Sequence, residues 1–220
     1  GTLRFTNAGA TLGAGGFQLD ATTTLQANKA LEFSHSFAVG SGHQLLLAGT
    51  DEDAEALEVL LPGEAPAPYV ARVTLRKLDA AVARRKRLGL PDAPIVCADT
   101  TVALGRQVLG KPLDAAQACS MLGELSGRTH RVLTAVAVAV GRRRFEALSI
   151  SRVTFATLRA AQIRAYVASG EPMGKAGAYA IQGRAAQFVQ HMSGSYSGIM
   201  GLPLYETAQL LQRCGSQTLR

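Results

Sequence analysis

Apolar side chains recur every three to four positions in two stretches of this chain, which is the spacing of an amphipathic helix. The two stretches are residues 66–87 and residues 160–168. A third helix is predicted from Asp114 to about residue 124, because Asp114 and Gln117 have the spacing of a capping box. The apolar positions that we expect to face the core are Val70, Val73, Leu78, Val82, Ile163, Tyr166 and Val167.

Between the helices, short apolar runs and alternating segments predict strands. Residues 45–48 and 95–98 are continuous apolar runs typical of buried strands, and the second is expected to end at Asp99. A hairpin around Gly105 and a long pair of strands are predicted at residues 102–109, 132–140 and 145–155. Strands that alternate with helices imply an α/β protein with a largely open sheet.

The first part of the chain differs in texture from the remainder. Residues 1–42 are rich in Gly, Thr and Ala, and their short alternating pieces predict strands and turns. We therefore divide the chain into an atypical N-terminal segment, residues 1–42, and a domain that comprises residues 43–220. A chain of 220 residues is long enough for one domain, or for a two-lobed unit, with a sizeable core.

The sequence also limits where the protein is expected to work. It has no run of eighteen apolar residues, so a membrane span is not expected. Its first residues lack the basic and then apolar pattern of a signal peptide, which favours a cytoplasmic location. The three cysteines have the spacing of neither a metal site nor a disulfide framework, so we expect small buried side chains at Cys97, Cys119 and Cys214.

The formal net charge of +7 includes two basic runs, residues 84–87 and residues 142–144. Such runs can bind the phosphates of a nucleic acid. Aromatic residues make up only 5% of the chain, however, and none interleaves with these arginines as a stacking platform for single strands requires. A solvated helix end and a hairpin tip are therefore the favoured interpretation, and nucleic acid is not an expected partner.

The most informative chemistry lies around Asp99 and Lys111. A carboxylate can hold a divalent metal or polarise water, and an ammonium can neutralise phosphate oxygens, so the pair suits hydrolysis of a phosphoanhydride. Residues 105–111 also match a phosphate-binding P-loop up to its last position, where Pro112 has no hydroxyl for magnesium. Because residues 106–109 have the pattern of a returning strand, a P-loop is not expected here.

A second candidate is the glycine-rich segment 174–183, which contains Lys175, Tyr179 and Gln182. Its many small residues allow the backbone to approach a ligand closely. Gln182 can both donate and accept hydrogen bonds, which suits the edge of a nucleobase. A glycine-rich loop around a buried tyrosine explains the same pattern without a ligand, so the segment alone leaves both interpretations open.

Several short motifs follow one another in this chain: Ala98-Asp99-Thr100, Leu109-Gly110-Lys111-Pro112, Leu125-Ser126-Gly127-Arg128-Thr129-His130, Lys175-Ala176-Gly177-Ala178-Tyr179, Ile181-Gln182-Gly183 and Gly201-Leu202-Pro203-Leu204. From about residue 45 to residue 211 this order resembles the Maf family of nucleoside triphosphate pyrophosphatases, which are related in fold to the inosine triphosphate pyrophosphatases. The resemblance implies an elongated, two-lobed α/β fold with a mixed sheet flanked by helices. It also implies a cytoplasmic homodimer that splits a nucleoside triphosphate between its α and β phosphates.

The resemblance implies roles for individual residues in phosphate chemistry. Asp99 would be the catalytic acid that activates water, directly or through a metal. Lys111 and Lys77 would neutralise the phosphates. Glu58 falls where the family has a metal-binding glutamate, so Glu58 and Asp99 would hold Mg²⁺ or Mn²⁺, although three other acidic residues stand close to Glu58 in the sequence.

The resemblance also bears on the substrate. In this family Thr after the catalytic Asp marks the branch that acts on dTTP and UTP, whereas Gln marks the branch that acts on 7-methyl-GTP. Thr100 and Gln182 both match the dTTP/UTP branch, and Lys175 would bind the substrate beside them. The hydroxyl and amide suit the O2, N3–H and O4 edge of a pyrimidine, which modified pyrimidine nucleotides can share.

Two departures from the family pattern bear on activity. Gly174 stands where the family usually has Asp, and nothing resembles the Ser-x-Ser-Pro-Arg-Arg phosphate clasp that begins the family's sequences. Residues 29–32, Lys-Ala-Leu-Glu, take the place of Ser-Pro-Arg-Arg, and an acid in place of a clamping arginine repels phosphate. The alternative function is therefore a catalytically impaired nucleotide-binding homologue, with nucleic acid binding through its basic surface.

Overall fold

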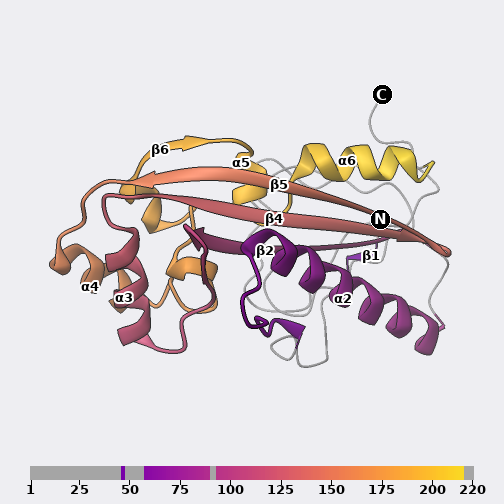
Figure 1. Ribbon diagram of the computed structural model, residues 1–220, viewed down its shortest axis with the longest axis horizontal. Helices are drawn as coiled ribbons and strands as arrows, with labels where there is room; N and C mark the ends of the chain where they lie inside the picture. Colours follow the sequence, from indigo (N-terminus) through magenta and orange to yellow (C-terminus); the bar gives the residue numbers. More distant parts are fainter. Residues whose placement is uncertain (1–45, 48–56, 90–92, 216–220) are drawn as a thin grey trace, which may run out of the picture.

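The centre of the molecule is an open six-stranded sheet in the order β1-β2-β4-β5-β6, with β3 paired to β2 outside that path (Figure 1). The computed structural model describes residues 46–47, 57–89 and 93–215. β1 runs parallel to β2, and the other pairs are antiparallel. The strands are β1 (Leu46–Leu47), β2 (Ile95–Leu104), β3 (Gln107–Leu109), β4 (Thr129–Val140), β5 (Arg143–Phe155) and β6 (Val189–Ser193).

Helices cover both faces of the sheet and one of its ends. α2 (Pro66–Arg87) packs on β2 and β4, while α5 (Tyr196–Ile199) and α6 (Leu204–Arg213) pack on the opposite face (Figure 1). The remaining helices gather at the end of the sheet where α3 and α4 lie. They are α3 (Ala115–Leu125), α4 (Ala160–Ala168) and the short 3₁₀ helices η1 (Ala176–Ala178) and η2 (Arg184–Phe188).

Successive side chains of β2 point alternately toward α2 and toward α6, on opposite faces of the sheet. Ile95 and Cys97 pack with Leu78 of α2, whereas Val96 packs with Leu210 of α6 on the other face. Because successive side chains of a strand point to opposite faces, Asp99 lies on the face of α2. Thr100, the next residue, therefore lies on the face of α5 and α6.

The end of the sheet that bears α3 and α4 has a separate core. Buried aromatic rings meet there edge to face, with centroids 4.9 Å apart for Phe155 and Tyr179 and 5.3 Å apart for Tyr166 and Phe188. Leu122 of α3 belongs to the same cluster. The two cores lie at opposite ends of β4 and β5, which gives the elongated, two-lobed mixed α/β fold expected from the sequence (Figure 1).

The helix predictions are confirmed closely. α2 and α4 have the bounds that their periodicity predicts, and the expected apolar positions are buried. Asp114 caps α3 by accepting a hydrogen bond from the Gln117 amide at 2.8 Å. Gly105 makes the predicted hairpin turn with a φ of +61°, so the Gly105–Lys111 stretch is a turn and a strand and not a P-loop.

One strand prediction is wrong. Asp99 does not end its strand, because β2 continues through it to Leu104. The reason is that Thr100, Thr101 and Val102 are β-branched and pair in register with Thr134, Leu133 and Val132 of β4. The acid therefore projects from the middle of a rigid strand.

Other expectations concern the termini and the surface. Residues 1–42, with the sequence that replaces the clasp, lie outside the described residues, as do residues 45 and 48 of the first predicted strand. The three cysteines are free; Cys97 is buried, whereas Cys119 and Cys214 are only partly buried. Among the described residues, no helix combines the length and apolar character needed to cross a membrane.

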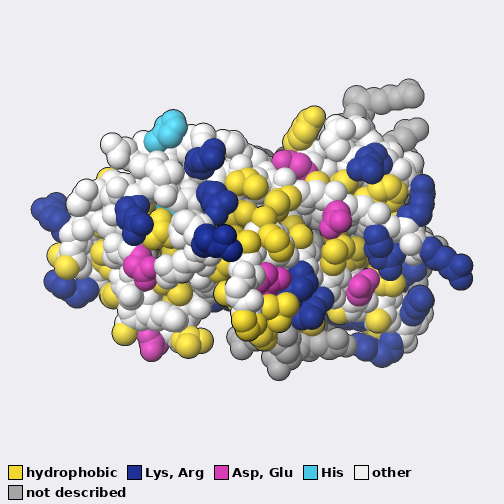
Figure 2. All heavy atoms as spheres, viewed as in Figure 1, with side chains coloured by type: hydrophobic (Ala, Val, Ile, Leu, Met, Phe, Trp, Pro, Cys, Tyr) yellow, Lys and Arg dark blue, Asp and Glu magenta, His cyan; other side chains and the backbone are white. Residues whose placement is uncertain are grey.

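The two basic runs lie at the same end of the molecule, away from α3 and α4 (Figure 1). Figure 2 shows Lys and Arg side chains on the surface of this end. One forms the last turn of α2, and the other forms the exposed β4–β5 hairpin tip, as the sequence predicts. Nε of Arg144 approaches Oδ1 of Asp79 in α2 at 3.7 Å. The guanidinium of Arg143 lies over the ring of Phe145, 5.5 Å from its centroid.

Candidate active site

A gap in the pairing of β2 exposes the middle of this strand. β1 pairs with Ile95 and Val96, and β3 pairs with residues 102–104. Between them, residues 97–101 meet no strand on this edge within the described part of the chain. An acid and a hydroxyl on opposite faces of one strand, Asp99 and Thr100, can therefore both reach a cavity at its edge.

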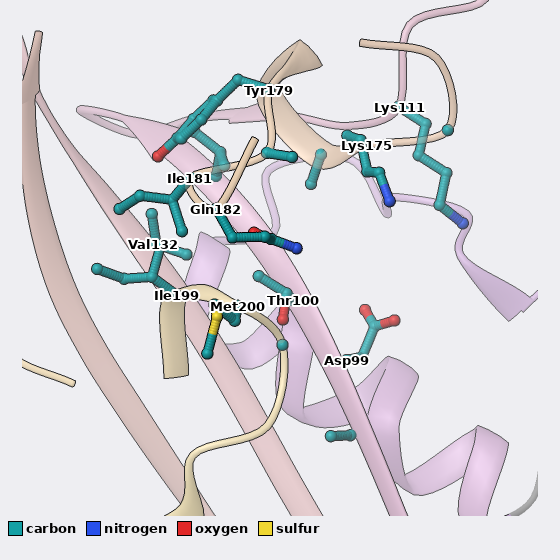
Figure 3. A pocket seen from close by; sticks show the side chains of 16 residues that line it. Asp99, Thr100, Lys111, Val132, Lys175, Tyr179, Ile181, Gln182, Ile199 and Met200 are labelled. Carbon is teal, nitrogen blue, oxygen red and sulfur yellow. The ribbon is translucent and has the colours of Figure 1, made fainter. Parts of the chain in front are cut away.

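The cavity at this edge has a volume of about 260 Å³. Its side chains change in character from one end to the other (Figure 3). Asp99, Lys111 and Lys175 stand at one end, and Thr100 and Gln182 come in the middle. The apolar end is formed by Val132, Ile181, Ile199 and Met200.

The charged end is continuous with a cluster of ion pairs. The ammonium of Lys77 donates to Oε1 of Glu58 at 2.7 Å and also to Oδ1 of Asp99. The Lys111 ammonium contacts both oxygens of Glu58, at 2.8 and 2.7 Å. The side chain of Lys111 is 44% exposed, whereas those of the other three residues are 13 to 17% exposed. Lys111 is thus the member of this cluster most open to a ligand.

Burial and ion pairing set the protonation of this cluster. Burial raises the pKa of Asp99 above its ordinary value, although the Lys77 ammonium opposes this effect. Burial acts in the same direction on Glu58, but hydrogen bonds from Lys111 and Lys77 outweigh it and lower the Glu58 pKa. Burial lowers the pKa of Lys77, but the combined effect of the Asp99 and Glu58 carboxylates is larger and raises this pKa above its ordinary value, so Lys77 stays charged. Asp99 is consequently the more basic carboxylate of the two.

Tyr69 of α2, which belongs to none of the sequence motifs, helps to hold Glu58 in place. Its hydroxyl donates to the backbone carbonyl of Glu58 at 2.8 Å. Burial, together with the charges of Asp99 and Glu58, raises the pKa of Tyr69, so the phenol keeps its proton. The only hint in the sequence is that Tyr69 belongs to the buried face of the predicted helix.

Glu58 and Asp99 are the carboxylates of this cluster that could hold a divalent metal. The Lys77 ammonium contacts Oε1 of Glu58 and Oδ1 of Asp99, so the two carboxylates lie close together. Magnesium often takes one or two carboxylates and completes its octahedron with water and substrate phosphates. In the described residues there is no group of three or more His, Cys, Asp or Glu side chains that could hold a metal alone.

Thr100 lies in a hydrogen-bonded row with two groups from distant parts of the chain. Its Oγ1 is 2.8 Å from Oγ1 of Thr134 in β4. The Thr134 hydroxyl in turn donates to the carbonyl of Gly198 in α5 at 2.6 Å. Gln182 points its amide toward Thr100 across the cavity (Figure 3).

The loop that contains Gln182 is held by Glu171. This carboxylate accepts from the Tyr166 hydroxyl at 2.9 Å and from the Arg184 amide at 3.1 Å. A Cβ on Gly183 would lie 2.2 Å from Oε1 of Glu171, so a larger residue at this position would displace the Glu171 carboxylate. Gln182 therefore projects from a braced turn.

Gly177 joins the two lysines that line the cavity. Its amide donates to the carbonyl of Gly110, which precedes Lys111, at 3.0 Å. Lys175 stands just before it at the start of η1. The side chains of Lys111 and Lys175 both line the charged end of the cavity (Figure 3).

The structure brings together the residues that the sequence singled out. Five of them line the cavity, whereas Lys77 and Glu58 lie behind Asp99 and Lys111 in the ion-pair cluster. His130, the last residue of one of the motifs, is buried in β4, and its Nε2 lies 2.8 Å from the Tyr179 hydroxyl. The five cavity residues are Asp99, Thr100, Lys111, Lys175 and Gln182.

Comparison with known proteins gives concordant results. Residues 35–214 match the family model described as Maf-like protein. A protein named dTTP/UTP pyrophosphatase from Albidiferax ferrireducens is 66% identical over 177 residues, which are 80% of this chain and 88% of the relative. Proteins of the same name from a Polaromonas species and from Cupriavidus metallidurans are 67% and 62% identical over the same shares of each chain.

Proposed function

Because this chain belongs to the Maf family, we propose that it hydrolyses dTTP and UTP to the nucleoside monophosphate and pyrophosphate. The observation that carries the proposal is the order of groups along one cavity. Cationic and acidic side chains at one end suit a triphosphate, and a hydroxyl with an amide in the middle suits a base edge.

The chemistry that this arrangement supports is displacement at the α-phosphorus by water. Asp99, as the more basic carboxylate, takes a proton from the attacking water, whose oxygen forms the new bond to phosphorus. The bond from that phosphorus to the bridging oxygen breaks, and pyrophosphate leaves. Lys111 and Lys175 stabilise the negative charge on the phosphates, and Lys77 keeps Asp99 in position.

We propose Mg²⁺ or Mn²⁺ as the cofactor, held by Glu58 and Asp99 together with substrate oxygens. When bound, such an ion neutralises charge on the phosphates. Lys111 leaves Glu58 for the phosphates in this arrangement, which its high exposure permits. Addition of excess EDTA is expected to reduce pyrophosphate release by at least about a hundredfold. Full activity after EDTA treatment and dialysis would exclude a divalent cofactor.

We also propose a homodimer and a cytoplasmic location. In support of a dimer, Leu148 and Ile150 of β5 are 37% and 47% exposed. They lie on the same face of the sheet as α2, which packs on β2 and β4. Figure 2 shows apolar side chains gathered in the middle of this face of the molecule. Light scattering distinguishes a dimer from a 23.0 kDa monomer.

The proposed activity is tested by the position of the cleavage. Purified protein is incubated with dTTP, UTP or ATP and Mg²⁺ or Mn²⁺, and the products are separated by anion exchange. Equimolar monophosphate and pyrophosphate from dTTP and UTP, with little from ATP, are expected. Release of orthophosphate and a nucleoside diphosphate would instead indicate a different phosphatase. Nucleotide binding without release of any product would favour the impaired homologue.

A further inference from the structure

The two threonines beside the cavity have a defined direction of hydrogen bonding. The carbonyl of Gly198 can only accept, so the single hydroxyl proton of Thr134 is directed to it, at 2.6 Å. The Oγ1 atoms of Thr134 and Thr100 are 2.8 Å apart, which requires one proton between them. Since the proton of Thr134 is already used, Thr100 must be the donor to Thr134.

This direction leaves Thr100 with only lone pairs for a ligand. A hydroxyl has one proton and two acceptor positions, and the proton of Thr100 points away from the cavity toward Thr134. Thr134 is 1% exposed, so solvent does not compete for this arrangement. The Thr100 oxygen that lines the cavity is therefore a hydrogen-bond acceptor.

We infer that Thr134 is a positioning residue that makes Thr100 an acceptor and thereby selects bases with a ring N–H over cytosine. The N3–H of uracil and thymine donates to Thr100, while Gln182 supplies a donor for a flanking carbonyl. Cytosine has an unprotonated N3 at neutral pH, which would place two lone pairs against each other. This inference rests on the proposed function and names the base edge that the same site reads.

Thr134→Val is a suitable test because it removes one hydroxyl and preserves the shape of the side chain. The carbonyl of Gly198 keeps a second donor, the Gly201 amide at 3.1 Å, so it is not left without a partner. Thr100 is then free to rotate and to donate to N3 of cytosine. Thr134→Ser retains the hydroxyl and is the matched control.

The experiment compares kcat/KM for UTP, CTP and N3-methyl-UTP in the parent and in both variants. The parent is expected to prefer UTP to CTP by at least about tenfold and to use N3-methyl-UTP poorly. T134V is expected to lower the UTP-to-CTP ratio by about tenfold, and T134S to stay within about twofold of the parent. N3-methyl-UTP remains poor in T134V, because it has neither a proton nor a free lone pair at N3.

Three results would overturn the inference. They are equal use of UTP and CTP by the parent, an unchanged ratio in T134V, and a gain of N3-methyl-UTP hydrolysis in T134V as large as that for CTP. The last would show only a looser cavity. Equal use of UTP and CTP by the parent overturns the inference even where T134V fails to fold, and T134S, which retains the hydroxyl, must then keep the same ratio as the parent. A parent that releases no pyrophosphate from any nucleotide contradicts the proposed function instead, so the two failures are distinct.

Discussion

Buried polar side chains near the cavity are neutral or paired, and His130 is the clearest neutral case. Burial lowers the pKa of His130 to about 4, and its ring lies against Phe155 and Tyr179. In an unfolded chain the imidazole has a pKa of about 6.5. Between these two values the unfolded state binds more protons than the native state, so stability rises with pH in this window.

The first prediction concerns the pH dependence of stability. The contribution of His130 is fully present above about pH 6.5 and is lost as the pH falls toward about 4, at a cost of about 3 kcal/mol. His130→Gln removes the titrating group and keeps a hydrogen-bonding side chain for Tyr179. Urea unfolding at pH 7.5 and pH 4.5 should show a difference in the free energy of unfolding that is about 2 kcal/mol smaller in H130Q.

The parent chain is the control for carboxylates, which titrate equally in both proteins. An identical loss of stability in H130Q and the parent on acidification would mean that His130 is not the group responsible.

At the scale of elements, the turn at η1 holds the two cavity lysines together. Gly177 has a φ of +67°, and a Cβ at this position would lie 2.9 Å from three side-chain atoms of Val102. Gly170, after α4, has a similar φ of +76° but nothing within 4 Å of an added Cβ. A comparison of Ala substitutions at the two glycines therefore separates the cost of backbone strain from the cost of steric overlap.

The second prediction uses this pair. Gly170→Ala should cost about 1 kcal/mol of stability, the strain of the left-handed conformation alone. Gly177→Ala should cost more, about 3 kcal/mol, because strain and overlap add. Denaturant unfolding of both variants provides the comparison. Equal losses of stability in the two variants would show that the Val102 side chain moves aside at no cost, so that η1 packs only loosely on β2.

Local patterns explain why the helices could be predicted and the end of β2 could not. Residues 66–87 and 160–168 have apolar spacing and flanking signals within the segment itself, so their bounds needed no tertiary information. The position of Asp99 depends on register with β4, about thirty-five residues away in the chain. An acid after an apolar run gives no sign of that pairing.

The candidate site divides in the same way. Asp99 and Lys111 could be predicted because each lies in a short motif, and these motifs follow one another in the order found in the Maf family. Thr134 was not foreseen, since its contact with Thr100 also follows from strand register. A signal was present, because Thr134 is the one polar residue within the apolar run 132–140.

At the scale of the whole molecule, the cavity joins the two cores. β2 contributes to both of them, with Cys97 packed under α2 and Val102 packed beside α3 and η1. A nucleotide that fills the cavity contacts β2, η1 and α5 together. Binding should therefore stabilise the entire fold and not a single segment.

The third prediction is that α,β-methylene-UTP with Mg²⁺ raises the free energy of unfolding. At a concentration one hundred times its Kd the gain should be about 2.7 kcal/mol, as mass action requires. The adenosine analogue at the same concentration should give less than half of this gain, because adenine lacks the N3–H and flanking carbonyl that Thr100 and Gln182 are placed to bind. Equal stabilisation by both analogues would contradict selection of the base.

The central claim is that Asp99 drives release of pyrophosphate from a pyrimidine nucleoside triphosphate, and the most direct measurement is UTP turnover by Asp99→Asn. Asp114→Asn is the matched control, since Asp114 is exposed, caps α3 and lies outside the cavity. The parent and D114N should release UMP and pyrophosphate at the same rate, with D99N slower by at least about a hundredfold. Pyrophosphate release by D99N at the rate of the parent would contradict the account.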